Sequence, residues 1–304
     1  MGKFERAFGH YAELIPDFPG FLDALRRAPP LHLRVNTVKA TVADVVRALA
    51  SQGVAAAPEP WCDVLLRLAD GAGPSAGTTL LHALGHVYVQ SASSAVAALA
   101  LDARPGDRVL DLCAAPGSKT SLLAQAMEDR GCLVANEPSP GRLKSLTANL
   151  DRMGVTCALV TTYSGQNFPR RTLFDRVLVD APCSGEGTWR GPEARPQATK
   201  PDFRAYLIRQ QRGVLSAAYD LVRPGGTVVY STCTYAPAEN EGVVGPFLEE
   251  TGASAVPLGV GIGGVPGLTE WEDRRFPPGL AHARRLYPHH FDSEGFFVVR
   301  LAKP

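Results

Sequence analysis

Two cysteines in the second half of the chain lie in turns that follow apolar, strand-like segments. Cys183 follows RVLVDAP and Cys233 ends GTVVYSTC, and both stand among Pro, Gly, Ser and Thr residues. A lone cysteine on a strand is usually a small buried hydrophobe, whereas turns of this kind are a poor place to fill a core. An ionised thiol is a strong nucleophile. The two positions therefore predict reactive thiols, with Asp180 as a neighbouring carboxylate.

One methylation reaction requires such a thiol. Carbon 5 of cytosine is a poor nucleophile while the ring stays aromatic. Addition of a thiolate to carbon 6 produces an enamine, whose carbon 5 can attack a sulfonium methyl group. A carboxyl group such as Asp180 can hydrogen-bond to the polar edge of the pyrimidine, and a base then removes the proton at carbon 5. The target base must also be unstacked, because neither face is open in a helix. Cys183, Cys233 and Asp180 are thus the candidate catalytic residues.

The segments around these residues must bring them together, and strands alternate with helices from Arg108 to about Leu301. Apolar strand patterns occur in RVLDLCA, CLVANE, CALVTTY, RVLVDAP, GTVVYSTC and EGFFVVRLA. Helical patterns occur in KTSLLAQAMEDR, in PGRLKSLTANLDRM and from about Asp202 to Val222. This alternation predicts an α/β fold with a parallel, doubly wound, Rossmann-like sheet that binds ligands at the carboxyl ends of its strands. The two thiols and Asp180 are therefore expected in one crevice.

A turn of small residues connects the first of these strands to its helix. The segment DLCAAPGSKT, from Asp111 to Thr120, lets the backbone approach a ligand closely and directs helix N–H groups at it. It lacks the glycine spacing of a phosphate-binding P-loop. Glu137 ends the second strand, where a carboxylate can hold the two hydroxyls of a ribose. Together these features predict a cofactor that contains a nucleoside.

The composition indicates a globular protein with two parts. Of 304 residues, 45% are hydrophobic and 20% are charged, and 31 basic residues balance 30 acidic ones. A nucleic-acid partner would therefore need local basic patches. Residues 1–90 are expected to form a small α+β appendage, and residues 91–304 the α/β domain. A Gly/Pro-rich stretch from Val256 to Gly267 is expected to be a mobile loop.

Several kinds of site and location are not indicated by the sequence. Neither a secretion signal nor a membrane-spanning segment is recognisable, so we expect a cytoplasmic protein without a membrane partner. The expected oligomeric state is a monomer. None of the six cysteines lies in a CxxC pair. His82 and His86 have the spacing of helical metal ligands, but no carboxylate or third ligand stands near them. A metal site is therefore not expected.

Basic residues gather in two places that can meet a polyanion. The first is a run in which only Glu193 and Asp202 are acidic, and its basic members are Arg190, Arg195, Lys200, Arg204, Arg209 and Arg212. This run is either an ordinary solvated helix face or a track for an RNA backbone beside the turn at Cys183. The second is RVNTVK, where three residues form another candidate RNA-binding surface: Arg34, Asn36 and Lys39.

Four motifs, taken in order, resemble those of one protein family: RVNTVK, DLCAAPGSKT, DAPCSGEG, and YSTCT followed by EN. They look like the Nol/Nop/Sun family of RNA cytosine-5 methyltransferases, over residues from about Arg34 to Leu301. The resemblance implies a Rossmann-like class I methyltransferase domain with a small N-terminal RNA-binding domain, S-adenosylmethionine as the cofactor and RNA as the partner. It also implies Cys233 as the nucleophile and Cys183 as the residue that supports product release.

The resemblance further implies where the cofactor binds. The residues that match the family's cofactor contacts are Cys113, Ala114, Ala115, Pro116, Gly117, Ser118, Lys119, Glu137 and Asp180. After the third strand the family usually has an aspartate where this chain has Ser164. The contact of Ser164 to the adenine end of the cofactor is therefore expected to differ.

Within the family, PEPWC, GHVYVQSASS and YPHHFDSEGFFVVRL look most like the bacterial enzymes that form 5-methylcytosine in 16S rRNA. The segment WRGPEA lacks the Lys-Asp pair of those enzymes, and the chain stops after the last strand, without their C-terminal RNA-binding domains. Ribosomal RNA is thus the expected target, with tRNA as the alternative. Two other readings stay open. One is a DNA cytosine-5 methyltransferase, with Cys183 as the attacking thiol, and the other is a non-catalytic RNA-binding factor in ribosome assembly.

Overall fold

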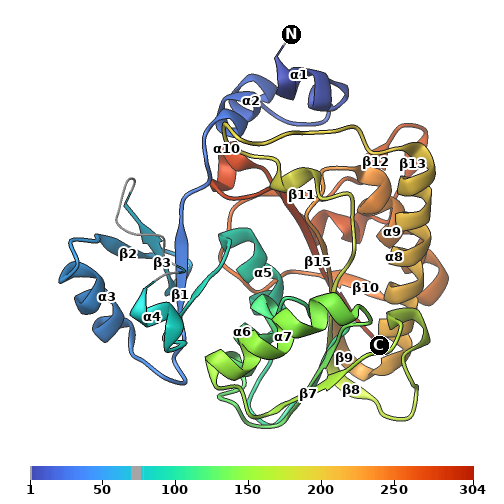
Figure 1. Ribbon diagram of the computed structural model, residues 1–304. Coiled ribbons are helices and arrows are strands. Elements are labelled where there is room, and N and C mark those ends of the chain that lie inside the picture. The colour runs from blue at the N-terminus through green and yellow to red at the C-terminus, as the bar shows by residue number, and fades with distance from the viewer. Residues whose placement is uncertain (1, 70–76, 78) are drawn as a thin grey trace.

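The centre of the fold is a nine-stranded sheet (Figure 1). A computed structural model of the chain describes residues 2–69, 77 and 79–304. Five strands of the sheet are parallel, in the spatial order β9, β8, β5, β6, β7. They are β5 (Arg108–Asp111), β6 (Cys132–Asn136), β7 (Ala158–Thr161), β8 (Phe174–Asp180) and β9 (Val222–Thr232). The predicted parallel α/β sheet is thereby confirmed.

The order of the parallel strands determines where a ligand can bind. The chain runs from β5 outward through β6 to β7, and then returns to the other side of β5 with β8 and β9. The strand order therefore reverses between β5 and β8. In open sheets of this type, ligands bind outside the carboxyl ends of the strands at the point of reversal. Asp111 and Asp180, the last residues of β5 and β8, stand at that point.

Antiparallel strands extend the sheet beyond β9. The strand β15 (Phe296–Ala302) pairs with β9, with Phe297 opposite Thr232 and Ala302 opposite Thr227. The other added strands are β10 (Ser254–Val256), β11 (Val265–Pro266) and β14 (Arg284–Leu286), and a separate ribbon joins β12 (Glu270–Trp271) to β13 (Arg274–Arg275). The start of β15 therefore lies beside the carboxyl end of β9.

Helices cover both faces of the sheet (Figure 1). They are α5 (Ala92–Ala100), α6 (Ser118–Ala126), α7 (Pro140–Met153), α8 (Pro201–Leu221), α9 (Glu241–Thr251) and the short α10 (Pro288–Phe291), with 3-10 turns at η3 (Gly165–Asn167), η4 (Glu186–Thr188), η5 (Pro237–Glu239) and η6 (Pro278–His282). Because successive strand residues face opposite sides, Val177 and Val179 of β8 pack with α8 and α9, whereas Leu178 packs with α5 and α6. Among the residues described, none of the helices has the length and apolar character that crossing a lipid bilayer requires.

The N-terminal residues form two bodies (Figure 1). The first consists of α1 (Lys3–Phe8), η1 (Gly9–Tyr11) and α2 (Phe18–Arg26). It packs on the large-sheet part, because Phe8 and Phe21 meet the ring of Tyr235 edge-on, with centroids 5.6 and 5.2 Å away. The second is an antiparallel sheet with the order β2-β3-β1-β4, which α3 covers. Its elements are β1 (His32–Val35), α3 (Val42–Ala50), β2 (Ala56–Glu59), β3 (Cys62–Leu68), α4 (Leu80–Ala83) and β4 (Val87–Val89). The small α+β appendage expected over residues 1–90 thus consists of two separate bodies, and only the second has a sheet with helices.

The Gly/Pro-rich stretch from Val256 to Gly267 differs from the expected loose loop. Leu258 is buried, and Val260 and Ile262 pack against the same hydrophobic cluster as α5 and α6. Its last residues form β11, which pairs with β14. The expectation is wrong because three aliphatic side chains at alternating positions give this glycine-rich segment apolar surface to bury.

Candidate active site

Two free thiols face each other at the carboxyl ends of β8 and β9. Cys183 lies three residues beyond β8, Cys233 follows β9 directly, and their sulfur atoms are 3.3 Å apart. This is a hydrogen-bond contact, far longer than the about 2.05 Å of a disulfide bond. The hydrogen bond to Cys233, together with burial, holds the pKa of the Cys183 thiol well above its usual value. Cys183 is therefore protonated at neutral pH, and its S–H is placed to donate to the sulfur of Cys233.

A lysine–aspartate pair lies beside the thiols. The carboxylate of Asp180 accepts a hydrogen bond from Lys119 Nζ at 2.7 Å and another from the hydroxyl of Ser231 at 2.8 Å. Burial alone lowers the pKa of Lys119, but the charges of Asp180 and the nearby Cys233 more than offset it, so that this pKa is raised. The ammonium also lies 5.6 Å from the centroid of the Phe296 ring. The pair supplies one fixed donor and one fixed acceptor near the two sulfurs.

Buried polar side chains hold the turn that carries Cys183. The sequence predicted no role for these side chains. The carboxylate of Glu239 is fully buried and accepts from the backbone N–H of Ser184 at 2.9 Å and from Gln211 Nε2 at 3.0 Å. The hydroxyl of Ser184 donates to Thr234 Oγ1 at 2.7 Å. Because Ser184 and Thr234 each follow one of the cysteines, these bonds fix the two cysteine turns relative to each other.

Two residues of the recognised motifs extend this scaffold. Glu186, from DAPCSGEG, accepts a hydrogen bond from the hydroxyl of Tyr11 at 2.8 Å and thereby ties the N-terminal helices to the site. Asn240, from the EN pair, accepts from Thr232 Oγ1 at 2.5 Å and donates to the carbonyl of Thr234 at 3.0 Å. The EN pair was the one sequence signal that could have identified Glu239 and Asn240 as part of the site.

Carboxylates also stand at the carboxyl ends of β5 and β6. Asp111 is buried, accepts from Thr120 Oγ1 at 2.8 Å, and has a second oxygen, Oδ1, without a partner among the described residues. Burial raises the pKa of Asp111 to about 6. Glu137, directly after β6, accepts from the backbone N–H of Ser139 at 2.8 Å and pairs with Arg142 at 3.1 Å. A buried acceptor without a partner is rare in native proteins, and the donor of a ligand can fill it.

The turn between β5 and α6 holds five of the predicted cofactor residues, and two more begin α6. The five are Cys113, Ala114, Ala115, Pro116 and Gly117, and the two are Ser118 and Lys119. Gly117 has a φ of 100°, and a Cβ there would lie 3.2 Å from Leu146 Cδ1, so that only glycine fits without strain. Burial raises the pKa of the Cys113 thiol. Ser164 is exposed in the turn after β7, whose backbone at Tyr163 is held by Asn136 at 2.9 and 3.0 Å. A backbone-lined turn between three carboxylates suits a nucleoside cofactor that carries a positive charge.

The expected RNA-binding surface at RVNTVK is wrong for two of its three residues. Arg34 is 1% exposed and donates to Ser121 Oγ at 2.7 Å, and Asn36 is 3% exposed and donates to the carbonyl of Met153 at 2.8 Å. Lys39 is exposed, but its ammonium lies on backbone carbonyls, one of them at the end of α7. These polar residues join the small sheet to α6 and α7, and this contact between distant segments buries them.

The basic run around α8 divides in two. Arg190 is buried and pairs with Asp292 at 2.6 Å, and Arg204 forms a salt bridge to the carboxylate of η4. Both therefore have structural partners within the chain, which corrects the expectation that they lie free for RNA. Arg209 and Arg212 are exposed on α8, and Arg212 reaches only the carbonyl of Gly242, at 3.2 Å.

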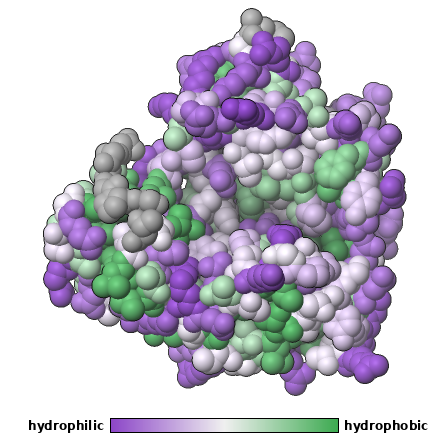
Figure 2. Space-filling model, in the orientation of Figure 1, coloured by the Kyte–Doolittle hydropathy of each residue, from purple (hydrophilic) through white to green (hydrophobic). Residues whose placement is uncertain are grey.

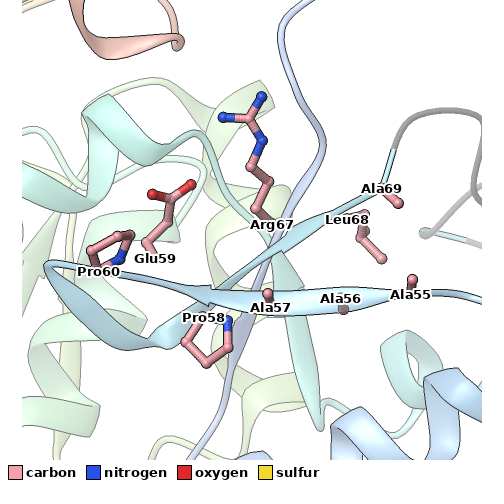
Figure 3. Close-up of a pocket in the computed structure, with 9 residues that line it drawn as sticks. All are labelled: Ala55, Ala56, Ala57, Pro58, Glu59, Pro60, Arg67, Leu68 and Ala69. Atoms are coloured by element: carbon pink, nitrogen blue, oxygen red, sulfur yellow. The ribbon is translucent and has the colours of Figure 1, made fainter.

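One pocket of the described residues lies away from the thiols (Figure 3). It has a volume of about 610 Å³, lies between β2 and β3, and is lined by small residues such as Ala57 and Pro58. Its two charged side chains, Glu59 and Arg67, bond to His32 and to Asp292 at 2.8 and 2.5 Å. The pocket holds no nucleophile.

No group of three or more potential metal ligands occurs in the described residues either. A recess at the centre of the face drawn in Figure 2 lies between the N-terminal helices, the small sheet and the large-sheet part.

Comparison with known proteins identifies the same two parts of the chain. Residues 98–302 match the family described as 16S rRNA methyltransferase RsmB/F, and residues 13–73 match the RsmF/B-like ferredoxin-like domain. A 26S rRNA (cytosine-C(5))-methyltransferase of Caenorhabditis elegans is 37% identical over the whole chain, which covers 46% of that protein. The ribosomal RNA small subunit methyltransferase F of Salmonella paratyphi B is 40% identical over 94% of the chain, which covers 60% of that protein. The chain therefore spans about half the length of these relatives.

Solved structures show the same fold. A methyltransferase homologue from Pyrococcus horikoshii is 32% identical, superposes with a TM-score of 0.85, and is similar over 99% of this chain and 93% of its own. NSun6 from the same organism is 23% identical with a TM-score of 0.84. The family match covers most of the chain and contains both cysteine motifs, and the resemblance drawn from the four motifs is confirmed. The chain belongs to the RsmB/F family of rRNA methyltransferases, within the Nol/Nop/Sun group.

Proposed function

We propose that this chain transfers a methyl group from S-adenosylmethionine to carbon 5 of a cytosine in RNA, through a covalent adduct with Cys233. The observation that carries the proposal is the 3.3 Å contact between the sulfur atoms of Cys183 and Cys233. The Lys119–Asp180 pair lies beside them. Two thiols at this distance suit a reaction in which one sulfur adds to the base and the other assists its departure.

Each side chain has a part in the proposed reaction. The thiolate of Cys233 adds to carbon 6, and the electron pair released from the C5–C6 double bond forms a new bond from carbon 5 to the methyl group. The bond from that methyl group to the cofactor's sulfur would break, and S-adenosylhomocysteine would leave with the electron pair. Asp180 can accept from the amino group of the cytosine, and Lys119 can donate to its carbonyl oxygen. A base then takes the proton from carbon 5, the double bond re-forms, and the C6–S pair returns to Cys233. The protonated Cys183 donates to this departing sulfur and thereby stabilises it.

The proposed cofactor supplies the methyl group on an electrophilic sulfonium. The residues that would hold it are the turn from Cys113 to Lys119, Glu137, and the carboxylates of Asp111 and Asp180. Carboxylates favour its positive charge, and the unpaired oxygen of Asp111 can accept from an amine or a hydroxyl. Ser164 stands at the turn after β7, where it offers a hydroxyl instead of the family's carboxylate.

Removing the carboxylate of Glu137 should weaken cofactor binding. We expect Glu137→Ala to cost about 1–3 kcal/mol of binding free energy, the range for loss of a charge-assisted hydrogen bond. Calorimetric titration with S-adenosylhomocysteine measures it. Ser164→Asp is the matched gain-of-contact variant and should tighten the complex if the adenine end lies at this turn. Unchanged affinity in Glu137→Ala would contradict the placement of the ribose.

The proposed substrate is ribosomal RNA. The support is the description of the matched family and the names of the relatives, which refer to 16S, 26S and small-subunit rRNA. Because the chain spans only part of those relatives, their target nucleotides are not carried over, and tRNA remains the alternative substrate. A division near residue 90, into an RNA-binding part and a methyltransferase part, and action in the cytoplasm as a monomer belong to the same proposal.

We further propose that the exposed face of α8 contacts the RNA backbone. Arg209 and Arg212 are exposed there, and the exposed rings of Phe203 and Tyr206 stack on each other with centroids 6.3 Å apart. Exposed arginines next to exposed aromatic rings suit single-stranded RNA, because phosphates pair with the former and bases stack on the latter.

Replacing Arg209 and Arg212 together by alanine should make RNA binding less dependent on salt. Each lost phosphate contact reduces the slope of log affinity against log salt by about 0.7 for a single strand, so the expected change is about 1.4. Filter binding to a single-stranded RNA at four salt concentrations measures the slope. Arg274→Ala/Arg275→Ala, which removes two exposed arginines of β13, is the control. If the slope of log affinity against log salt is the same in both double variants, the α8 arginines do not contact the RNA backbone.

Methyl transfer from labelled S-adenosylmethionine tests the function as a whole. We expect label in RNA from a strain that lacks the gene, none in DNA, and loss of one bisulfite-resistant cytosine in that strain's RNA. Label in DNA alone would favour the DNA reading. No label in either nucleic acid, with RNA binding retained, would favour the non-catalytic assembly factor, for which Lys119, Asp180 and the thiol pair have no use.

A further inference from the structure

The N-terminal helices reach the candidate site through the hydroxyl of one tyrosine. Tyr11, in η1, is 4% exposed, and its hydroxyl donates to Glu186 Oε2 at 2.8 Å, across 175 residues of sequence. The ring of Tyr11 lies against those of Phe8 and Tyr235, with centroids 6.5 and 6.4 Å away. Phenylalanine would fill this aromatic cluster equally well, because the packing uses the ring alone. The hydroxyl is therefore not needed to attach the helices.

The carboxylate oxygen that accepts this bond is also connected to both cysteine turns. Thr234, the residue after Cys233, donates to the same Oε2 of Glu186 at 3.2 Å. Ser184, the residue after Cys183, donates its hydroxyl to Thr234 Oγ1 at 2.7 Å. A continuous chain of hydroxyl bonds thus runs from the two cysteine turns to the carboxylate, where the tyrosine hydroxyl meets it. Buried hydrogen bonds in such a chain strengthen one another.

The tyrosine hydroxyl is the closer of the two donors to this oxygen. The other carboxylate oxygen of Glu186 forms a salt bridge with Arg204. Burial and the charge of Glu186 raise the pKa of Tyr11, so that its hydroxyl stays protonated and remains a donor. Without it, Oε2 would keep only the longer bond from Thr234. Loss of a donor to a buried charge is costly, so the carboxylate would shift and the chain to the cysteine turns would loosen.

We propose that Tyr11 is a positioning residue for methyl transfer. Its hydroxyl acts through Glu186 and Thr234, and holds the turn of Cys183 against Cys233 at the distance that departure of the thiolate requires. This inference rests on the proposed function. It makes the N-terminal helices a part of the catalytic unit, although they contribute no residue that touches the substrate.

Three single variants test this role, with labelled S-adenosylmethionine and RNA from a strain that lacks the gene. Tyr11→Phe removes only the hydroxyl. Thr234→Val breaks the chain one bond further on, with little change of shape. Tyr219→Phe is the matched control, because it removes a hydroxyl that bonds to the carbonyl of Thr251 at 3.3 Å, outside both cysteine turns. Thermal unfolding of each variant establishes a temperature at which all of them are folded.

We expect Tyr11→Phe to lower kcat about tenfold, equivalent to about 1.4 kcal/mol, without raising KM for RNA. Part of the protein should be trapped as an RNA adduct of Cys233, because departure of the thiolate is slowed. Thr234→Val should have the same effects. Adding Tyr11→Phe to it should lower kcat by less than about threefold more, since both changes break one chain and are therefore not additive in free energy.

A second measurement needs no RNA. Diamide oxidises two close thiols to a disulfide by taking up their two hydrogen atoms, so the rate of this reaction reports how close the sulfur atoms of Cys183 and Cys233 stay. Peptide mapping identifies the bond that forms. The rate should fall severalfold in Tyr11→Phe and in Thr234→Val, and stay unchanged in Tyr219→Phe.

A higher KM with an unchanged kcat in Tyr11→Phe would assign the N-terminal helices to RNA binding and overturn the inference. Kinetic values equal to those of Tyr219→Phe would overturn it as well, and so would fully additive effects of Tyr11→Phe and Thr234→Val on the free energy of activation. If the unchanged chain transfers no methyl group to RNA, the proposed function fails. The diamide rates then decide by themselves whether Tyr11 positions the two thiols.

Discussion

Replacing Cys233 by alanine is expected to reduce methyl transfer by at least about a thousandfold, because loss of a covalent nucleophile leaves only binding and positioning. Affinity for S-adenosylhomocysteine should stay unchanged, since the thiol is needed for chemistry only. Cys157→Ala is the matched control. That thiol packs near the α5 and α6 cluster, and burial raises its pKa to about 12, so that it is inert. Equal loss of activity in both variants would mean that the effect comes from folding.

The variant Cys183→Ala separates the roles of the two sulfurs. It removes the S–H that is placed 3.3 Å from the other sulfur, so that attack and methylation proceed while release of the thiolate is slow. An RNA–protein adduct should therefore accumulate, survive a denaturing gel and map to Cys233. The double variant should form none. An adduct in Cys233→Ala and none in Cys183→Ala would instead identify Cys183 as the attacking residue, as expected for a DNA cytosine-5 methyltransferase.

The meeting of the two thiols is a feature that the sequence alone could predict. It follows from two local patterns, an apolar run and a turn after it, together with the rule that parallel strands present their carboxyl ends on one edge of the sheet. Cys183 and Cys233 are 50 residues apart, yet their strands β8 and β9 are neighbours. The positions of Asp111, Glu137 and Asp180 at strand ends follow from the same rule.

The burial of RVNTVK could not be predicted in this way. Arg34 and Asn36 are polar residues at the start of the chain, and nothing nearby in sequence indicates partners for them. Their partners lie on α6 and at the end of α7, at Ser121 and Met153, which are 87 and 117 residues away. Whether a polar side chain is a free surface group or a buried link depends on such distant contacts, and these exist only once the small sheet has docked.

The buried polar side chains around the two thiols could not be predicted either, because their partners are also distant in the sequence. Gln211 lies in the middle of α8, where its type suggests a solvated helix position, yet it is fully buried and bonds to Glu239 at 3.0 Å. Arg204 lies near the start of α8 and pairs with Glu186, so it too contacts a residue of the polar network around the thiols. The charges in the sequence allowed either a solvated helix face or an RNA track here, whereas part of this charge holds the turns of the candidate site. The charge of each side chain could thus be read from the sequence, whereas the partner that the side chain contacts could not.

Breaking the ion pair between Arg285 and Glu241 is expected to have the largest effect on stability. Arg285, on β14, is 1% exposed, and its Nε donates to Glu241 Oε1 at 2.7 Å, while Nη1 donates to the carbonyl of Tyr235 at 2.9 Å. Glu241, the first residue of α9, is fully buried and also accepts from the backbone N–H of Leu268 at 3.0 Å. Arg285→Met would leave this carboxylate without its counter-charge. We expect a loss of about 3–5 kcal/mol in the free energy of unfolding, as for other buried pairs that lose one partner.

Urea unfolding measures this loss, and two further variants identify its cause. Arg285→Met/Glu241→Gln removes the stranded charge and should recover part of the stability, because the cost comes mainly from the unpaired carboxylate. Arg275→Met breaks the exposed pair with Glu270 on the β12–β13 ribbon, where the arginine side chain is 88% exposed, and should cost less than about 1 kcal/mol. Because Tyr235 lies two residues after Cys233, Arg285→Met should also lower methyl transfer at temperatures where the chain is still folded. A loss in Arg285→Met as small as in Arg275→Met would show that the buried pair does not hold the turn that follows Cys233.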